Sequence, residues 1–125
     1  MLRLLLDEHI SPRVVAGLRR LDASLVVHAM KEWEDGAFPG RADAECLVEA
    51  AHQDLTLVTY DRRTIPVILK AWADEGRGHG GVIFVDEKTI APSDVGGLVR
   101  ALRVLIRRMG SLDWRDRAVF LSRAQ

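Results

Sequence analysis

The sequence has one cysteine, no long apolar run and no excess of either charge, and each absence narrows what the chain can be. Cys46 has no partner for an internal disulfide, which is typical of a reducing cytoplasm, and we expect its thiol to be a small buried apolar group. No stretch is long and apolar enough to cross a bilayer, so we expect no membrane span. No charged start leads into an apolar core and a cleavage site, so we also expect no export signal.

The formal net charge is zero, so the overall charge does not mark the chain as a nucleic-acid-binding protein. The charges are nevertheless unevenly distributed. Seven acids and two bases lie between Lys31 and Asp54, whereas seven arginines and two aspartates lie between Arg100 and Gln125. These segments are either solvated helix faces or an acidic site beside a basic surface that holds a polyanion.

Short apolar runs alternate with segments of helical periodicity along the chain. Strands are expected over Leu2–Leu6, Leu25–His28, Leu55–Tyr60 and Val82–Val85, with a short fifth strand over Ala118–Leu121. Each connection between strands holds a helix, which predicts a parallel sheet with right-handed crossovers. The predicted fold is therefore one α/β domain over residues 1–125, with three α/β/α layers and a central parallel sheet of four or five strands.

Capping residues predict where the helices begin and end. We expect Ser11 to cap the first helix, with Pro12 as its first residue, and Thr64 to cap the third. A second helix is expected from Ala42 to Gln53. The dipeptide Pro92-Ser93 is expected to open the last helix, and Gly110 to end it.

Three of the apolar runs stop at an aspartate, namely Asp7, Asp61 and Asp86. Parallel strands end at one edge of the sheet, where open α/β sheets bind their ligands. Carboxylates gathered there repel one another unless a cation neutralises them. Asp43, at the start of the second helix, is the first choice for a further acid. Glu45 is the alternative, because the two point roughly 200° apart on a helix.

Carboxylates suit hard cations, and no cysteine set or paired histidines indicate zinc. Two Mg²⁺ or Mn²⁺ ions about 4 Å apart can bind a scissile phosphate, generate a hydroxide and stabilise the leaving oxygen. The predicted catalytic metal ligands are Asp7, Asp43 and Asp61, completed by Asp86 or Glu45. Alternatively, an aspartate after a strand can cap a helix or form a turn. For Asp86, this structural role and a metal-binding role are equally supported by the sequence.

Four further residues near the acids are candidate substrate contacts: His9, Ser11, Arg13 and Arg62. The arginines could grip RNA phosphates or act as internal counter-ions for the aspartates. The imidazole of His9 could touch a phosphate or cap the next helix.

The segment from Lys31 to Arg41 has no period and is predicted to be a long loop over the strand ends. Its two aromatic residues, Trp33 and Phe38, either fill the core or form a stacking surface for a base or a partner helix.

Three segments resemble short PIN-like proteins and occur in the family's order. Leu5–Pro12 resembles an opening that reads Asp-Glu-Asn-Leu-Ser, with His9 in place of asparagine. Gly40–Glu45 resembles a Gly-small-Ser-Asp-acid-acid segment. Leu57–Arg62 resembles Val-Thr-His-Asp-Arg, with Tyr60 in place of histidine. The resemblance spans roughly the first 90 residues.

This resemblance implies a PIN-like α/β/α fold and a Mg²⁺- or Mn²⁺-dependent endoribonuclease. Many such proteins are toxins of the VapC type, which implies RNA as substrate, an antitoxin protein as partner, a homodimer and a cytoplasmic location. Two alternatives remain open. One is a receiver-like phosphoacceptor domain, in which Asp7-Glu8, Asp61 and Lys88 supply the acid pair, the acceptor and the lysine. The other is a catalytically silent PIN-like module that binds RNA or protein.

Overall fold

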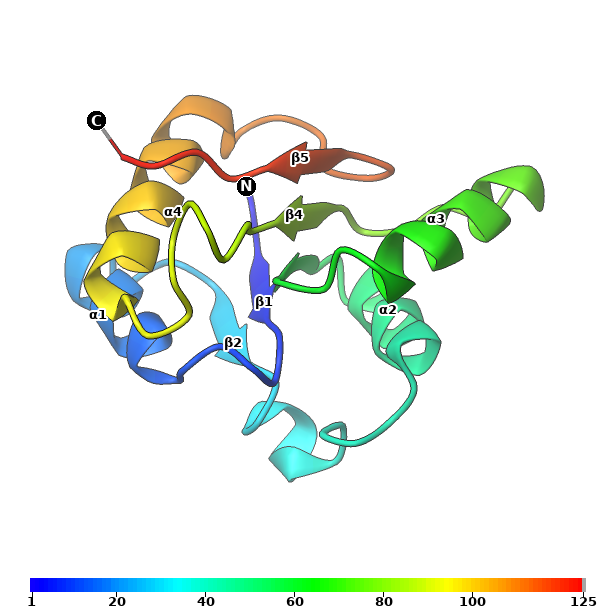
Figure 1. Ribbon diagram of the computed structural model, residues 1–125, viewed down its shortest axis with the longest axis horizontal. Coiled ribbons are helices and arrows are strands. Elements are labelled where there is room, and N and C mark those ends of the chain that lie inside the picture. The colour runs from blue at the N-terminus through cyan, green and yellow to red at the C-terminus, as the bar shows by residue number, and fades with distance from the viewer. Residues whose placement is uncertain (125) are drawn as a thin grey trace.

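A parallel sheet organises the chain, whose residues 1–124 are described by a computed structural model (Figure 1). Strands and helices alternate in the predicted order, and a short 3₁₀ turn, η1, follows the second strand. The elements are β1 (Leu4–Leu6), α1 (Arg13–Leu21), β2 (Val27–Ala29), η1 (Trp33–Gly36), α2 (Asp43–His52), β3 (Thr56–Thr59), α3 (Thr64–Asp74), β4 (Val82–Phe84), α4 (Val95–Met109) and β5 (Ala118–Phe120).

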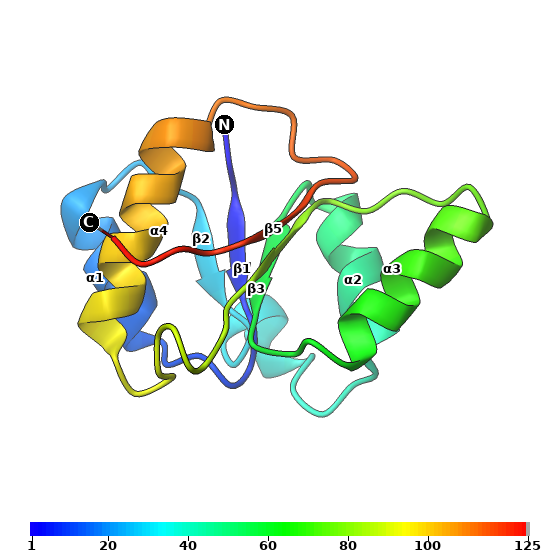
Figure 2. The same ribbon diagram turned by 45° about the horizontal axis from the view of Figure 1, so that its top comes forward.

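The sheet has the strand order β2-β1-β3-β4-β5, and every neighbouring pair is parallel. Helices α1 and α4 lie on one face and α2 and α3 on the other, as Figure 2 shows with the sheet between them. The predicted three-layer α/β/α architecture is therefore confirmed, and the sheet has five strands. Within residues 1–124, no helix has both the length and the apolar character of a membrane span.

Apolar residues on successive positions of the strands explain why both faces are covered. In β1, Leu4 and Leu6 belong to the core beneath α1 and α4, whereas Leu5 belongs to the core beneath α2 and α3. All three side chains are fully buried. Since burial of one leucine side chain contributes about 1.5–3 kcal/mol, such a strand is stable only between two layers of helices.

The fifth strand differs from the others because it lies at an edge of the sheet. Val119 packs against the core, but Ala118 and Phe120 are exposed. Phe120 is opposite Phe84 of β4 in the parallel register. The outermost strand thus presents an aromatic side chain to solvent.

The first helix begins one residue later than predicted. Pro12 precedes α1 rather than opening it, and the Ser11 hydroxyl accepts a hydrogen bond from the Arg13 amide at 3.2 Å. Ser11 therefore stabilises the turn that leads into α1, but the expectation that it caps the helix with Pro12 as first helical residue was wrong by one position.

The third and fourth helices are capped by aspartates instead of the predicted residues. Thr64 is the first residue of α3, and one Asp61 carboxylate oxygen accepts hydrogen bonds from the Arg63 and Thr64 amides, both at 2.8 Å. At α4, Asp94 accepts from the Gly97 amide at 2.9 Å. The expectation that Pro92-Ser93 opens this helix was wrong by two residues.

The aromatic residues of the Lys31–Arg41 loop fill the core. The Trp33 and Phe38 rings lie 4.7 Å apart, and both side chains are buried beneath the α2–α3 layer. Neither ring offers an open face for a base. The loop is also partly ordered as η1 rather than irregular throughout.

The aspartate cap of α4 gives a direct test of this description. Replacement of Asp94 by alanine leaves an unpaired amide at the helix start, and we expect a loss of about 0.5–2 kcal/mol in the free energy of unfolding. The measurement is urea denaturation followed by circular dichroism. Ser93→Ala is the matched control, because Ser93 belongs to the dipeptide predicted to open the helix and lies next to Asp94, and it should change stability by less than about 0.5 kcal/mol.

Candidate functional site

Three of the predicted acids come together where β1 and β3 end and α2 begins. The pKa of Asp43 is raised by burial, by the charges of Asp61 and Asp7, by a hydrogen bond with Asp61 and by the charge of Glu8. These carboxylates therefore lie within mutual electrostatic reach. In Figure 2 the loops that follow β1, β2 and β3 lie together at the lower edge of the sheet.

A buried threonine ties the two strand ends together. The Thr59 hydroxyl donates a hydrogen bond to one carboxylate oxygen of Asp7 and accepts one from the Asp61 amide at 3.0 Å. The other Asp7 oxygen accepts from the His9 amide at 3.1 Å. Asp7 is thus held in place by one donor from its own turn and one from the neighbouring strand.

Asp43 and Asp61 differ in their affinity for a proton. Burial alone would raise the pKa of Asp61, but hydrogen bonds from the Thr64 and Arg63 amides outweigh it and hold this pKa below its usual range. The Asp43 carboxyl shares a hydrogen bond with Asp61 and has a raised pKa. The environment therefore favours the protonated form of Asp43 and the ionised form of Asp61.

Glu8 is a member of this group that was not among the predicted ligands. One of its carboxylate oxygens accepts a hydrogen bond from the Gly40 amide at 3.1 Å, which fastens the β1–α1 turn to the loop before α2. Its charge contributes to the raised pKa of Asp43. The signal was present in the sequence as the acid pair Asp7-Glu8 within the PIN-like opening.

The thiol of Cys46 also lies within the field of these acids. Burial, with the charges of Asp43, Glu8 and Asp7, raises its pKa to about 11. The side chain is 4% exposed, so the expectation of a buried apolar thiol is confirmed. Cys46 is one turn beyond Asp43, and this turn of α2 therefore faces the acidic site.

The two remaining candidate ligands have other partners. Glu45 is exposed and pairs with Arg41 at 3.8 Å. Asp86 pairs with Arg62 at 3.3 Å and accepts a hydrogen bond from the Lys88 amide at 2.9 Å. Neither acid is among the groups that raise the pKa of Asp43. As metal ligands, Glu45 and Asp86 remain predictions without support from these contacts.

The candidate substrate contacts surround the acids in different ways. His9 and Ser11 lie in the turn after β1 and contribute an amide and a hydroxyl to its hydrogen bonds. Arg13 is exposed at the start of α1, and in the part of the chain that the structure describes it forms no ion pair with an acid. Arg62 neutralises Asp86 rather than Asp61.

The donor set fits a hard cation, although no three carboxylate, imidazole or thiol groups among residues 1–124 are already arranged as a metal-binding group. The chain's hydrogen bonds go to one oxygen of Asp61 and one of Glu8. The second Glu8 oxygen is thereby left for a ligand, whereas the Asp61 carboxyl also shares a hydrogen bond with Asp43. Oxygen donors of this kind are typical of Mg²⁺ or Mn²⁺ sites.

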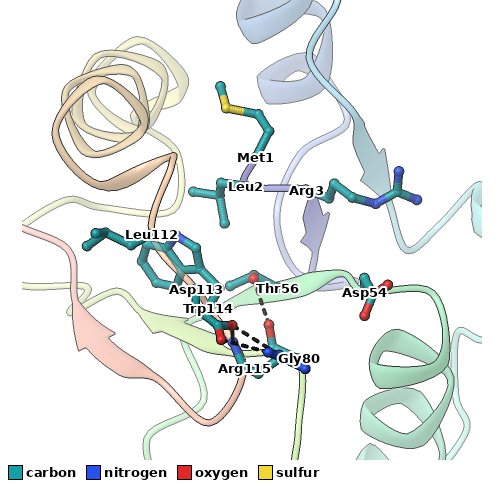
Figure 3. Close-up of a pocket in the computed structure, with 10 residues that line it drawn as sticks. All are labelled: Met1, Leu2, Arg3, Asp54, Thr56, Gly80, Leu112, Asp113, Trp114 and Arg115. Atoms are coloured by element: carbon teal, nitrogen blue, oxygen red, sulfur yellow. Dashed lines mark hydrogen bonds and ion pairs between the residues drawn. The ribbon is translucent and has the colours of Figure 1, made fainter.

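A hollow of about 410 Å³ lies at the opposite, amino edge of the sheet (Figure 3). Its lining includes Arg3 before β1, Thr56 at the start of β3 and Gly80 before β4. Its charges are partly satisfied internally, because Arg115 pairs with Asp113 at 2.9 Å. It is therefore separate from the acids at the carboxyl ends of the strands.

Comparison with protein-family models, curated proteins and solved structures finds no match for this chain. The resemblance to PIN-like proteins therefore rests on the three sequence segments alone.

The role of Thr59 can be separated from its contribution to stability. Thr59→Val leaves an Asp7 oxygen without its donor, and we expect a loss of about 1–3 kcal/mol in the free energy of unfolding together with weaker Mn²⁺ binding. The measurements are urea denaturation and isothermal titration calorimetry.

Thr56→Val is the matched control. Thr56 is equally buried and donates to the Gly80 carbonyl at 2.8 Å, but it lies at the amino edge of the sheet. The Thr56→Val substitution should reduce the free energy of unfolding and leave Mn²⁺ binding unchanged. Equal effects of both substitutions on Mn²⁺ binding would contradict the role given to Thr59.

Proposed function

We propose that the chain is a PIN-like endoribonuclease that uses Mg²⁺ or Mn²⁺ to hydrolyse RNA phosphodiesters. The observation that carries the proposal is the meeting of acids at one edge of the sheet: Thr59 joins Asp7 to the turn of Asp61, and Asp43 lies within reach of both charges. Acids from three separate segments meet at the sheet edge that binds ligands in open α/β folds. A divalent ion relieves their repulsion, which a structural role for each aspartate alone would not require.

The chain's own groups hold and orient the reacting parts. When bound, divalent ions activate water and neutralise charge on the scissile phosphate and the leaving oxygen. Asp7, fixed by Thr59 and the His9 amide, and Asp61, fixed by the amides at the start of α3, present oriented oxygens. Asp43, at the start of α2, would supply a further carboxylate to the ion. Glu8, rather than Asp86 or Glu45, completes the set.

Exposed basic side chains outside the acidic site favour the binding of a polyanionic substrate. Arg13 is exposed at the start of α1, and Arg100, Arg103 and Arg107 are exposed on α4. The three α4 arginines follow a spacing of three and four residues, which places them along one side of that helix. They form a basic strip on the α1–α4 layer that phosphates could contact.

The biological setting follows from the resemblance to VapC-type toxins. We propose that the protein is the toxin of a toxin–antitoxin pair, that it is a cytoplasmic homodimer, and that an antitoxin protein inhibits it.

A receiver-like phosphoacceptor domain is the second candidate, because the strand order β2-β1-β3-β4-β5 is the doubly wound order that receiver domains use. Two features of the structure count against a receiver-like domain. The Asp61 carboxylate caps α3 through the Arg63 and Thr64 amides, and Lys88 follows β4 rather than β5. Stable phosphorylation of Asp61 by acetyl phosphate, without RNA hydrolysis, would favour this candidate over the nuclease.

Hydrolysis of single-stranded RNA in the presence of Mn²⁺ tests the proposed activity. We expect Asp7→Asn, Asp43→Asn and Asp61→Asn each to lower kcat at least about 100-fold, because each removes a charged ligand. Glu45→Gln is the matched control, since Glu45 is an acid of the same helix that faces Arg41. It should retain activity within about threefold. Cleavage that is unaffected by EDTA or by Asp7→Asn would contradict the mechanism.

Divalent ions should also stabilise the fold in a pH-dependent manner. A raised pKa in the folded state means that Asp43 favours folding below its ordinary pKa of 3.8 and loses this contribution as pH rises through the raised value. A ligand that binds only the folded state stabilises it by mass action. At neutral pH, Mn²⁺ at 100 times its Kd should add about 2.7 kcal/mol to the free energy of unfolding, seen as a higher Tm.

This gain should shrink as pH falls through the Asp43 pKa, because the proton competes with the ion. Asp43→Asn should raise Tm without metal and abolish most of the gain with metal. An equal gain in Asp43→Asn would show that the ion binds elsewhere, and no gain in the wild type would favour the catalytically silent module.

A further inference from the structure

A recess of about 510 Å³ borders the acidic site on the side of β4 and β5. It lies between the β3–α3 turn, the residue after Asp86 and the edge strand. Its lining residues are Tyr60, Asp61, Arg62, Arg63, Glu87 and Phe120. Asp61 therefore belongs both to this recess and to the carboxylate group that includes Asp43 and Asp7. A ligand that fills the recess reaches the proposed site of chemistry.

One wall of the recess is formed by Phe120, an aromatic side chain that is largely exposed to solvent. Phe120 is 62% exposed, and its ring packs on Phe84 with centroids 5.4 Å apart and planes inclined by 31°. Phe84 is buried and is opposite Phe120 in the register of β4 and β5. The Phe120 ring is therefore supported from the sheet side while much of it remains open to solvent, which suits stacking of a planar ligand.

The recess also offers cationic groups to an anion, beside the acids Asp61 and Glu87 that line it. Two consecutive arginines, Arg62 and Arg63, follow Asp61. Arg62 contacts Asp86 at 3.3 Å, whereas Arg63 is exposed and forms no ion pair within residues 1–124. A guanidinium group without an acid partner, beside an open aromatic ring, matches the phosphate and base of one nucleotide. The volume lies within the range of about 300–1,000 Å³ found for small-ligand sites.

We propose that this recess binds one nucleotide of a single-stranded RNA, with its base stacked on Phe120 and its phosphate at Arg63. The proposal rests on the proposed ribonuclease function and specifies its substrate, because the neighbouring phosphodiester is then placed at Asp61. Stacking accepts every base, so the recess selects for strandedness rather than sequence. A base within an A-form duplex is paired and stacked on its neighbours and does not reach the Phe120 ring.

Binding of a short fluorescein-labelled single-stranded RNA, measured by anisotropy in EDTA to prevent hydrolysis, tests the proposal. Phe120→Ala should raise Kd about 5- to 150-fold, in line with the loss of one stacked base. Phe120→Trp should bind as tightly as the wild type or more tightly, and Phe120→Leu should be as weak as Phe120→Ala. Arg63→Gln should weaken binding and reduce the slope of log Kd against log salt by about 1.

Val67→Ala is the matched control. Val67 is 68% exposed on α3 and does not line the recess, so its substitution should leave Kd unchanged. The RNA duplex of the same sequence should bind the wild type more weakly than the single strand. Because Phe120 and Arg63 are exposed, these variants should retain the wild-type circular dichroism spectrum and Tm.

Several outcomes would overturn the proposal. Unchanged RNA binding in Phe120→Ala would do so, as would full binding by Phe120→Leu, which keeps apolar contact without a ring. A wild-type dimer that Phe120→Ala converts to a monomer, with equal RNA affinity, would show that the β5 edge pairs with a second copy of the chain instead.

The test also separates this proposal from the ribonuclease itself. RNA binding that depends on Phe120, without Mn²⁺-dependent hydrolysis, would support the nucleotide-binding role of the recess and contradict the ribonuclease activity. Hydrolysis with the same KM in the wild type and Phe120→Ala would leave the nuclease in place and contradict the recess.

Discussion

The hydroxyl group of Thr59 makes the contact on which the arrangement of acids depends. It donates to Asp7 and accepts from the Asp61 amide, so it joins the ends of β1 and β3. Both strands are buried on two faces, and a polar group at their ends must find a partner within the protein. One side chain therefore satisfies the strand ends and holds two carboxylates together against their repulsion. Burial and the charges of Asp61 and Asp7 raise the pKa of Asp43, whereas hydrogen bonds from the Thr64 and Arg63 amides lower the pKa of Asp61.

The layered architecture explains why the remaining features of the carboxyl edge lie where they do. Helices α2 and α3 cover one face of the sheet, and α2 packs directly on β3. The edge strand β5 is left with Phe120 exposed, and the Phe120 ring packs on Phe84 of its own sheet. The same edge thus carries fixed carboxylates near its centre and, toward β5, an open ring with two arginines. The amino edge has a hollow whose Arg115 is already paired with Asp113. The two edges of the sheet therefore differ in the charged and aromatic side chains that they present to solvent.

Much of the fold was predictable from the sequence because it depends on local patterns. The apolar runs predicted the strands, including the short run at Ala118–Leu121, and the helical segments between them required a parallel sheet. The helix starts were less predictable. Thr64 was expected to cap α3, but the preceding turn brings the Asp61 carboxylate to the amides first. Trp33 and Phe38 had two interpretations from the sequence, and only their packing against each other within the core decided between them.

The order of the elements and the positions of acids at strand ends could be predicted from the residues alone, because hydrophobic periodicity and chain direction are local properties. Which acids share a site depends on the three-dimensional arrangement. It brings Glu8 close to Asp43 through the turn fastened at Gly40, and it pairs Asp86 with an arginine 24 residues away. Electrostatic interaction depends on distance through space and on burial, and neither is encoded by spacing along the chain. The exposure of Phe120 also depends on the tertiary structure, since β5 lies at the edge of the sheet.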